Sequence, residues 1–318
     1  MSTVVGVHGR SYTIGEVLRQ RRSDLVPLII KAKSKEEVFI LKSVTKEDYD
    51  LSLRLATHFA SCRRLRMHTD CNPEEGILIY PYYQDTLLSL IEGDGNLPTA
   101  ERKKILRGTA EAIQELHTKG WIHCDIKPDN ILVNWTCDDQ GTKTVTDVAL
   151  GDFDIAYELP SGQLSRRTRS AIGNVMWRSP EGQTGITSKA SDVFSFGLVC
   201  IYVFGGGKLL LIDDYEELTR DGITAEQDII TRHFSYFGPA PEELFEQASN
   251  EKWTRALRSA SAAAEGGVRD QPGLRFTNWS AELGREAQDL ISGMTNLNPT
   301  SRIPIEEVIK HRWLQGTP

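Results

Sequence analysis

Cysteine is scarce in this chain of 318 residues and follows no pairing pattern. The cysteines are odd in number, contain no C-x-x-C pair and lie at positions 62, 71, 124, 137 and 200. Such usage is typical of a reducing compartment rather than of a disulfide-built secreted domain. We therefore expect a cytoplasmic location, with the nucleus as the alternative.

Long hydrophobic runs are also missing. The first residues of the chain carry no apolar core of the kind that a signal peptide has. The longest apolar run, residues 193–204, is interrupted by Ser195 and Gly197 and is too short to cross a bilayer. This run predicts a buried helix, and we expect no membrane partner.

An excess of positive charge is absent as well. The chain has 37 Lys and Arg against 44 Asp and Glu, and the net charge of -7 argues against nucleic acid or an acidic membrane surface as the main partner. Its 39% hydrophobic and 25% charged residues are ordinary for a soluble globular protein. The length is sufficient for one large domain or two lobes with a sizeable core.

Two stretches, residues 121–133 and 150–155, place charged side chains between short apolar runs. Residues 131–133 and 148–150 have the pattern of neighbouring strands joined by a polar turn. The loop before the first strand and the end of the second strand should then lie close together. This arrangement is expected to gather four polar residues: Asp125, Lys127, Asn130 and Asp152.

The letters H-C-D-I-K-P-D-N at 123–130 and D-F-D at 152–154 resemble the protein kinase family. Its catalytic loop reads H-R-D-x-K-P-x-N and its metal-binding turn reads D-F-G. Cys124 stands where the family has Arg, and Asp154 where it has Gly. Further resemblances, covering about residues 12–315 in all, lie at 173–181 (ending in S-P-E for A-P-E), 191–197 and 298–302.

The resemblance implies a division of labour for phosphoryl transfer from ATP, which depends on alignment and on neutralising phosphate charge. Asp125 would accept the proton of the substrate hydroxyl, and Lys127 would neutralise the transferring group. Asn130 and Asp152 would supply the hard oxygen ligands that Mg²⁺ takes beside phosphates.

Strand-like runs at 12–18, 26–30 and 37–41 precede a helix expected at 46–60. Lys42 ends the third run, and F-I-L-K at 39–42 resembles the family's V-A-I-K, whose lysine holds the α- and β-phosphates of ATP. The helix should supply an acid to pair with this lysine. The candidates are Glu47, Asp48 and Asp50, of which Asp50 fits best.

The family's glycine-rich cover over the phosphates has no glycine here. By position it falls between Leu18 and Val26, with Arg19, Arg21 and Asp24 at the glycine places. Leu18 and Val26 are expected to border the nucleotide. Residues 76–83 resemble the last strand of the small lobe and the hinge, so Tyr80 and Tyr82 are expected to line the adenine pocket.

Other segments carry simpler expectations. Thr99 should cap a helix that runs to about residue 119 and carries the catalytic loop. Asp192 should brace the backbone of that loop, and Glu181 should form a buried pair with Arg302. The small-residue stretch 259–267 has the composition of an exposed insertion.

These patterns together predict a bilobal α+β kinase fold over residues 12–315, with lobes 12–83 and 84–315 and an N-terminal tail, 1–11. The expected activity is transfer of the γ-phosphate of Mg-ATP to Ser or Thr of a protein. Two alternatives stay open: a catalytically inactive nucleotide-binding or scaffold protein, and a small-molecule phosphotransferase of the aminoglycoside or choline kinase type. The sequence leaves the oligomeric state and the substrate open.

Overall fold

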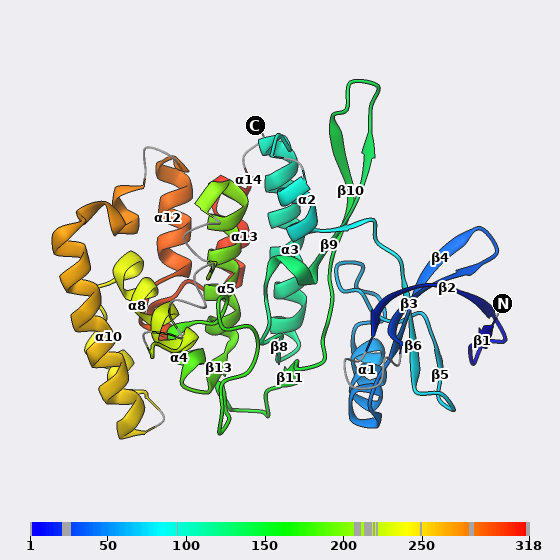
Figure 1. The fold of residues 1–318 in the computed structure, drawn as a ribbon, viewed down its shortest axis with the longest axis horizontal. Coiled ribbons are helices and arrows are strands. Elements are labelled where there is room, and N and C mark those ends of the chain that lie inside the picture. The colour runs from blue at the N-terminus through cyan, green and yellow to red at the C-terminus, as the bar shows by residue number, and fades with distance from the viewer. Residues whose placement is uncertain are drawn as a thin grey trace.

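A sheet-rich part and a helix-rich part lie side by side in the molecule (Figure 1). The computed structural model describes residues 2–20, 27–93, 95–206, 211, 212, 218, 220, 222–248, 250–279 and 283–315. The expected bilobal α+β fold is confirmed. The sheet-rich part ends with the strand that finishes at Pro81, and the helix-rich part follows it.

The first part is a six-stranded sheet in which each strand pairs antiparallel with its neighbour. Its order is β1 (Thr3–Val5), β2 (Ser11–Gln20), β3 (Pro27–Ser34), β4 (Glu37–Ser43), β6 (Ile77–Pro81) and β5 (Asp70–Asn72). Burial alternates along β4, where Phe39 and Leu41 are buried while Ile40 is half-buried, as one face of the sheet packs on a core. Lys42 follows at the end of this strand, opposite Leu78 of β6.

The expected tail 1–11 is wrong as a description of the N-terminus. Residues 3–5 form β1, because Val4 is buried and the strand pairs in register with residues 11–13. Beyond it, the Val7 amide donates to the Cys71 carbonyl at 2.9 Å and ties the turn to β5. The first residues are therefore part of the sheet.

Helix α1 (Lys46–His58) connects β4 to β5 and matches the expected helix. The hydroxyl of Thr45 caps it by accepting from the Asp48 amide, and acids in its first turn complement the helix dipole.

The second part is mainly helical. Its helices are α2 (Leu87–Gly93), α3 (Thr99–Thr118), α4 (Pro180–Gln183), α5 (Lys189–Ile201), α8 (Ala225–Phe237), α9 (Glu242–Glu246), α10 (Glu251–Asp270), α12 (Arg285–Met294), α13 (Ile305–Lys310) and α14 (Arg312–Gln315). Its short strands are β7 (Asp85–Thr86), β8 (Trp121–Ile122), β9 (Ile131–Cys137), β10 (Lys143–Leu150), β11 (Tyr157–Glu158), β12 (Ser165–Arg167) and β13 (Ile186–Ser188).

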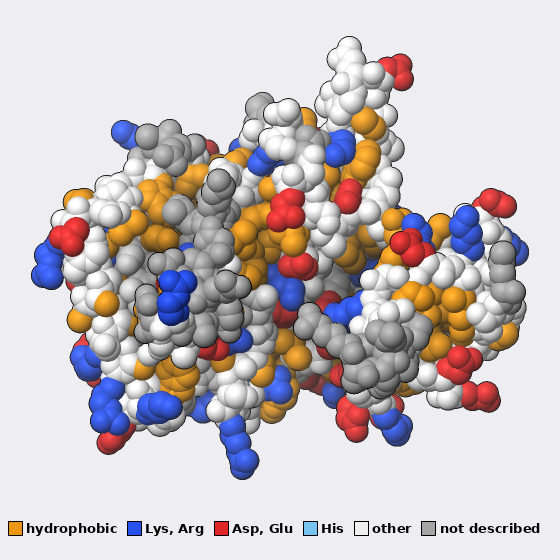
Figure 2. Space-filling view, viewed as in Figure 1, with side chains coloured by type: hydrophobic (Ala, Val, Ile, Leu, Met, Phe, Trp, Pro, Cys, Tyr) orange, Lys and Arg blue, Asp and Glu red, His pale blue; other side chains and the backbone are white. Residues whose placement is uncertain are grey.

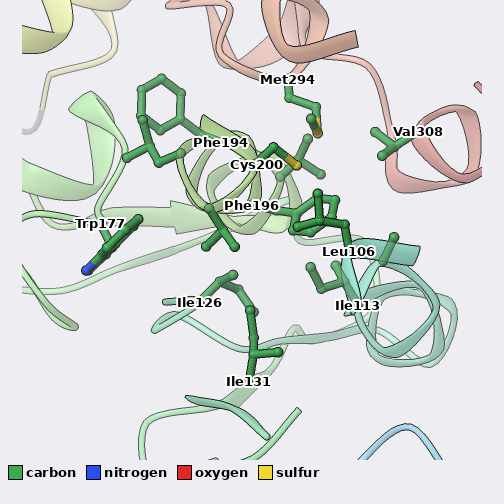
Figure 3. Packing of buried hydrophobic residues seen from close by; sticks show 14 of the residues in the cluster. Leu106, Ile113, Ile126, Ile131, Trp177, Phe194, Phe196, Cys200, Met294 and Val308 are labelled. Carbon is green, nitrogen blue, oxygen red and sulfur yellow. The ribbon is translucent and has the colours of Figure 1, made fainter. Parts of the chain in front are cut away.

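Helix α5 lies at the centre of the helical core and confirms the buried helix expected from the longest apolar run. Ser188 and Ser191 form a capping box at its start. Figure 3 shows Phe194, Phe196 and Cys200 of this helix among apolar side chains that come from the catalytic loop, β9, α3 and α12. This packing fixes the loop before β9 against a rigid support.

Strands β9 and β10 pair antiparallel, as expected, from Leu150 opposite Ile131 to Lys143 opposite Cys137. The tip of this hairpin extends beyond the rest of the molecule in Figure 1. The pairing brings the end of β10 beside the start of β9 and thereby places the D-F-D turn next to the catalytic loop.

Two local expectations are wrong. Helix α3 begins at Thr99, but Pro98 is its N-cap and no side chain caps it. Residues 259–267 are not a fully exposed stretch, because they form the middle of α10, where Ala264 is buried, alanines favour helix and Asn250 caps the first turn. Leu257 and Ala264, seven residues apart, are buried and hold this helix on the core.

The expected pair between Glu181 and Arg302 is confirmed. Arg302 donates Nη1 to Glu181 Oε1 at 2.5 Å and Nη2 to Oε2 at 2.8 Å, and both side chains are buried. The pair joins the S-P-E segment at the start of α4 to the loop before α13.

Figure 2 shows acidic and basic side chains interspersed over one face of the molecule. Across the described ranges, no helix combines the length and apolar character needed to cross a membrane.

Candidate active site

A cavity of about 350 Å³ lies between the sheet and the helical part. Leu18, Ile29 and Ile40 line it from the sheet, and Leu132 lines it from β9. Its polar lining includes Lys42, Asn130, Asp152 and Asp154. The cavity therefore combines apolar walls with a charged lining.

The expected nucleotide-binding residues fall into two groups. Lys42, Leu18, Tyr80 and Tyr82 all line this cavity. Val26, like Arg21 and Asp24, lies outside the described residues. Arg19, which stands where the family pattern has its first glycine, also lines the cavity. Its guanidinium comes from strand β2.

Asp125 is held by three neighbours. Its Oδ1 accepts from the Asn174 amide at 2.8 Å. Its Oδ2 lies 2.8 Å from Lys127 Nζ and accepts from Asn130 Nδ2 at 3.1 Å. The carboxylate is therefore fixed in orientation beside a cation, and three of the expected site residues are in direct contact.

Gly173 makes the contact between Asp125 and Asn174 possible. Its φ is 84°, and a Cβ at this position would lie 2.4 Å from the Cys124 carbonyl oxygen. Only glycine allows the segment around residue 173 to come this close to the loop at 123–130.

The backbone of the loop rests on Asp192, as expected. One carboxylate oxygen accepts from the His123 amide at 2.9 Å and the other accepts from the Cys124 amide at 3.0 Å. Cys124 has a φ of 67°, a backbone conformation that residues other than glycine rarely adopt. The two hydrogen bonds to Asp192 help to hold the backbone in this conformation. His117 of α3 completes the contact, with Nε2 3.0 Å from Asp192.

His123 connects the loop to the D-F-D turn. Its Nε2 lies 3.0 Å from the Gly151 carbonyl oxygen, and its ring packs 5.0 Å from that of Phe153. Asp152, which follows Gly151 in the turn, has a φ of 63°. This left-handed turn directs the Asp152 carboxylate into the cavity toward Lys42.

Lys42 forms ion pairs with both acids of the turn. Its Nζ lies 2.7 Å from Asp152 Oδ1 and 2.6 Å from Asp154 Oδ2. Burial lowers the pKa of Lys42, but the charges of the two carboxylates outweigh burial and raise it. Burial also raises the pKa of Asp154, whereas at Asp152 the effect of Lys42 is stronger and the net pKa is lowered. The two acids therefore differ in their readiness to take a proton.

The expected pairing of Lys42 with an acid of α1 is wrong. Asp50 instead faces Lys46 one helical turn away, at 3.2 Å. Asp48 accepts a hydrogen bond from Thr45 within the cap, at 2.9 Å. Toward the sheet, the helix presents Ser52, whose hydroxyl is 3.3 Å from Tyr80 Oη. The sequence pointed to helix acids because it gave no sign that Asp154 would reach Lys42.

The donors around the cavity fit a magnesium ion held partly by phosphates. Asn130 uses its amide nitrogen on Asp125, which leaves its Oδ1 for another partner, and Asp152 and Asp154 add carboxylate oxygens. The described residues contain no cluster of three or more His, Cys, Asp or Glu able to hold a metal ion by themselves. Mg²⁺ usually keeps water and phosphate ligands beside one or two carboxylates, as this donor set would require.

Arg66 is among the lining residues of the cavity that were not foreseen. Arg66, in the segment before β5, lines the cavity on the side of Tyr80 and Gly151. Nothing in the sequence distinguishes it from Arg63 and Arg64 beside it, because its position depends on contacts with β6 and β10.

Comparison with known proteins agrees with this geometry. Residues 28–314 match the family model described as the protein kinase domain. The chain is 31% identical over 170 residues to an L-type lectin-domain containing receptor kinase, SIT1, of Oryza sativa subsp. japonica, covering 48% of this chain and 24% of the relative.

Two further relatives carry kinase names. The serine/threonine-protein kinase PrkC of Bacillus subtilis is 34% identical over 122 residues, 38% of this chain and 17% of its own length. The mitogen-activated protein kinase mpkA of Aspergillus fumigatus is 23% identical over 271 residues, 82% of this chain and 58% of its own. The chain thus spans less than two thirds of the length of these relatives.

Proposed function

Because the chain belongs to the protein kinase family, we propose that it transfers the γ-phosphate of Mg-ATP to serine or threonine of a protein substrate. The observation that carries the proposal is the fixed Asp125 carboxylate. It contacts Lys127 and Asn130, and Asn130 lines the same cavity as Lys42 and Asp152. Asn130 thus connects the proposed proton acceptor to the cavity proposed for the nucleotide.

Asp125 is proposed to orient the substrate hydroxyl and accept its proton. Its hydrogen bonds to Asn130 and the Asn174 amide hold it without help from substrate, which favours alignment before transfer. Lys127, now 2.8 Å from Asp125, is the cation nearest to this carboxylate and is proposed to neutralise the transferring phosphoryl group.

The nucleotide is proposed to lie in the cavity between the two parts. Leu18, Tyr80 and Tyr82 would border the base together with Val26, while Lys42 would hold the inner phosphates. Asn130 and Asp152 would hold Mg²⁺, with Asp154 as a further oxygen donor. The ion would neutralise phosphate oxygens during transfer.

The Ser/Thr assignment is supported by Lys127, the lysine of the K-P-x-N pattern, and by relatives named serine/threonine-protein kinases. A protein substrate is further supported by the S-P-E segment and its partner Arg302, which the small-molecule phosphotransferases lack. The reducing-compartment signature of the cysteines favours a cytoplasmic or nuclear site of action.

An inactive scaffold is the second candidate function. Asp154 favours it, because this acid replaces the glycine of the family's metal-binding turn. The phosphate cover also has no glycine at its expected places. Activity is nevertheless preferred, since Asp125, Lys127, Asn130 and Asp152 are all present and the first three are in direct contact.

A mixture of peptides that carry a single Ser, Thr or Tyr tests the proposal. The purified full chain is incubated with Mg-ATP, and mass spectrometry identifies the phosphorylated acceptors. We expect phosphate on Ser and Thr peptides and none on Tyr peptides. Phosphate on tyrosine alone would contradict the acceptor assignment, and phosphorylation of no peptide and no site on the chain itself would favour the scaffold.

A further inference from the structure

Arg66 is an unusual lining residue for the cavity. Its amide donates to the Leu150 carbonyl at 2.8 Å, which fixes its backbone beside Gly151. Its side chain packs against Gly151, where a Cβ would lie 3.7 Å from the Arg66 stem. The guanidinium carbon lies 5.0 Å from the centre of the Tyr80 ring. The side chain is therefore held in place by packing along its length.

The guanidinium has spare hydrogen-bond capacity. Its Nε donates to the Pro81 carbonyl at 2.9 Å. Among the described residues, no other group accepts from it and no carboxylate lies within ion-pair distance. Asp152 and Asp154, the acids of the cavity, are engaged by Lys42. Arginine carries five N–H donors and no acceptor, so most of its donors remain for a ligand.

The position of Arg66 separates it from the phosphate end. Lys42 stands opposite Leu78 in the sheet, and Pro81 lies three residues further along β6. At a rise of about 3.3 Å per residue, the anchor of Arg66 is roughly 10 Å along the strand from Lys42. Ile40, which pairs with Tyr80, forms the apolar wall at this end. A ring inserted between Ile40 and Leu132 would present an edge toward Arg66.

At Pro81 the backbone has little to offer a base. Pro81 has no N–H, and its carbonyl already accepts from Arg66. Burial lowers the pKa of Arg66 to about 10, which leaves the group protonated at neutral pH. At Pro81 the cavity therefore meets a donor-only cation in place of a free backbone donor or acceptor.

We propose that Arg66 reads the base of the bound nucleotide by donating to acceptor atoms, so that the cavity binds guanine at least as tightly as adenine. Guanine has two adjacent acceptors, O6 and N7, which an arginine fork matches, whereas adenine has an amino donor at the six-position. The inference rests on the proposed function, because it takes a nucleoside triphosphate as the occupant. The enzyme would then use GTP as well as ATP.

Equilibrium binding of nucleoside diphosphates tests the inference without turnover. Calorimetry with MgADP, MgGDP and MgIDP is applied to the full wild-type chain, Arg66→Met, Arg66→Lys and the matched control Arg63→Met. Met keeps a stem that can pack on Gly151 and Tyr80 but removes the donors. Arg63 is an exposed arginine of the same segment.

Wild type is expected to bind MgGDP with a Kd equal to or below that of MgADP. Arg66→Met should raise the ratio of the GDP to the ADP dissociation constant by about tenfold or more, with Arg66→Lys between the two because it lacks the bidentate fork. Arg63→Met should leave the ratio unchanged. A ratio in Arg66→Met within about twofold of wild type would overturn the inference.

Inosine diphosphate gives a test that needs no variant. Hypoxanthine keeps O6 and N7 but lacks the amino group of guanine, so wild type should bind MgIDP within about threefold of MgGDP. Binding of MgADP about tenfold tighter than both oxo-purines would overturn the inference while leaving the kinase proposal intact. Failure of folded protein to bind any of the three nucleotides would overturn both proposals.

Discussion

Lys42 forms an ion pair with Asp154, with Nζ 2.6 Å from Oδ2. The two residues are 112 positions apart in the chain. Asp154 stands at the glycine place of the D-F-G pattern, and Asp48 and Asp50 of α1 contact Thr45 and Lys46 instead. The acids that pair with Lys42 are thus supplied by the turn rather than by the helix.

Replacement of Asp154 tests this arrangement. Asp154→Ala should lower kcat/KM for the nucleotide by about tenfold or more, because Lys42 loses a partner that orients it. Asp50→Ala is the matched control and should change kcat/KM by less than about twofold, since Asp50 only pairs with the exposed Lys46. Steady-state kinetics at varied nucleotide concentration gives both values. A larger loss in Asp50→Ala than in Asp154→Ala would restore the helix acid to this role.

Magnesium binding should depend on Asp152. Asp152→Asn keeps the shape and tolerates the φ of 63° at this position, but removes the anionic oxygen. We expect nucleotide binding to lose its enhancement by Mg²⁺, while the melting temperature without nucleotide stays nearly unchanged.

Calorimetry measures nucleotide affinity at a series of Mg²⁺ concentrations. Asp129→Asn is the control, because Asp129 is an exposed carboxylate that lines the same cavity. An Asp152→Asn protein with the magnesium enhancement of wild type would remove Asp152 from the metal site.

Loss of the buried pair should destabilise the helical part. Arg302→Ala leaves the Glu181 carboxylate buried without its partner, which costs about 3–5 kcal/mol in the free energy of unfolding. Arg312→Ala breaks an exposed pair with Glu286 and should cost about 0–1 kcal/mol. Urea unfolding of both variants measures the difference. Equal losses in the two variants would show that burial of the Glu181–Arg302 pair is unimportant.

The same pair gives a pH dependence of defined sign. Burial alone would raise the pKa of Glu181, but the charge and hydrogen bonds of Arg302 lower it below its ordinary value of 4.5. A lowered folded-state pKa adds stability above the unfolded-state pKa, and this contribution is lost as the pH falls through the folded-state pKa. The gap in melting temperature between wild type and Arg302→Ala should therefore be largest near neutral pH and narrow on acidification, because in the variant burial raises the pKa of the unpaired Glu181 and its protonation removes the buried charge. A gap that widens on acidification would contradict this sign.

Phosphorylation of the activation segment should have little effect on catalysis. Cys124 stands where related kinases have the arginine that binds such a phosphate, and its thiol, whose pKa burial raises to about 12, supplies no positive charge itself. The Thr168 hydroxyl instead donates to the Ser170 carbonyl at 2.8 Å. Replacing both Thr168 and Ser170 with Ala should change turnover by less than about threefold, or roughly 0.7 kcal/mol of barrier. A loss of about a hundredfold in folded protein would show that phosphate on this segment controls the enzyme.

The local sequence pattern was sufficient to predict which strands position the site residues. The apolar runs around residues 131 and 148 and the turn between them fixed the β9–β10 pairing, and this pairing determines the position of Asp152 relative to Asn130. The motif letters then placed Lys42 at the end of a strand. These features depend on neighbours in sequence, which the period of apolar residues reports well.

Contacts across the fold could not be read in this way. The partner of Lys42 depends on how far the D-F-D turn reaches, and Arg66 depends on the meeting of two segments with β6 and β10. Helix α10 was missed for another reason, because its small residues have the composition of a linker. The spacing of Leu257 and Ala264, with Asn250 as a cap, was the available signal.

Asp125 gives the most direct test of the central proposal that the chain is an active kinase. Wild type and Asp125→Asn are compared for transfer of labelled γ-phosphate from Mg-ATP. Calorimetry with MgADP first gives the nucleotide affinity of each protein, so that both can be assayed at equal nucleotide occupancy. We expect wild type to transfer phosphate and Asp125→Asn to be slower by about a hundredfold or more, with nucleotide affinity changed by less than about threefold. Transfer at the same rate by both proteins, or no transfer by a wild-type protein that binds nucleotide, would contradict catalysis by this site.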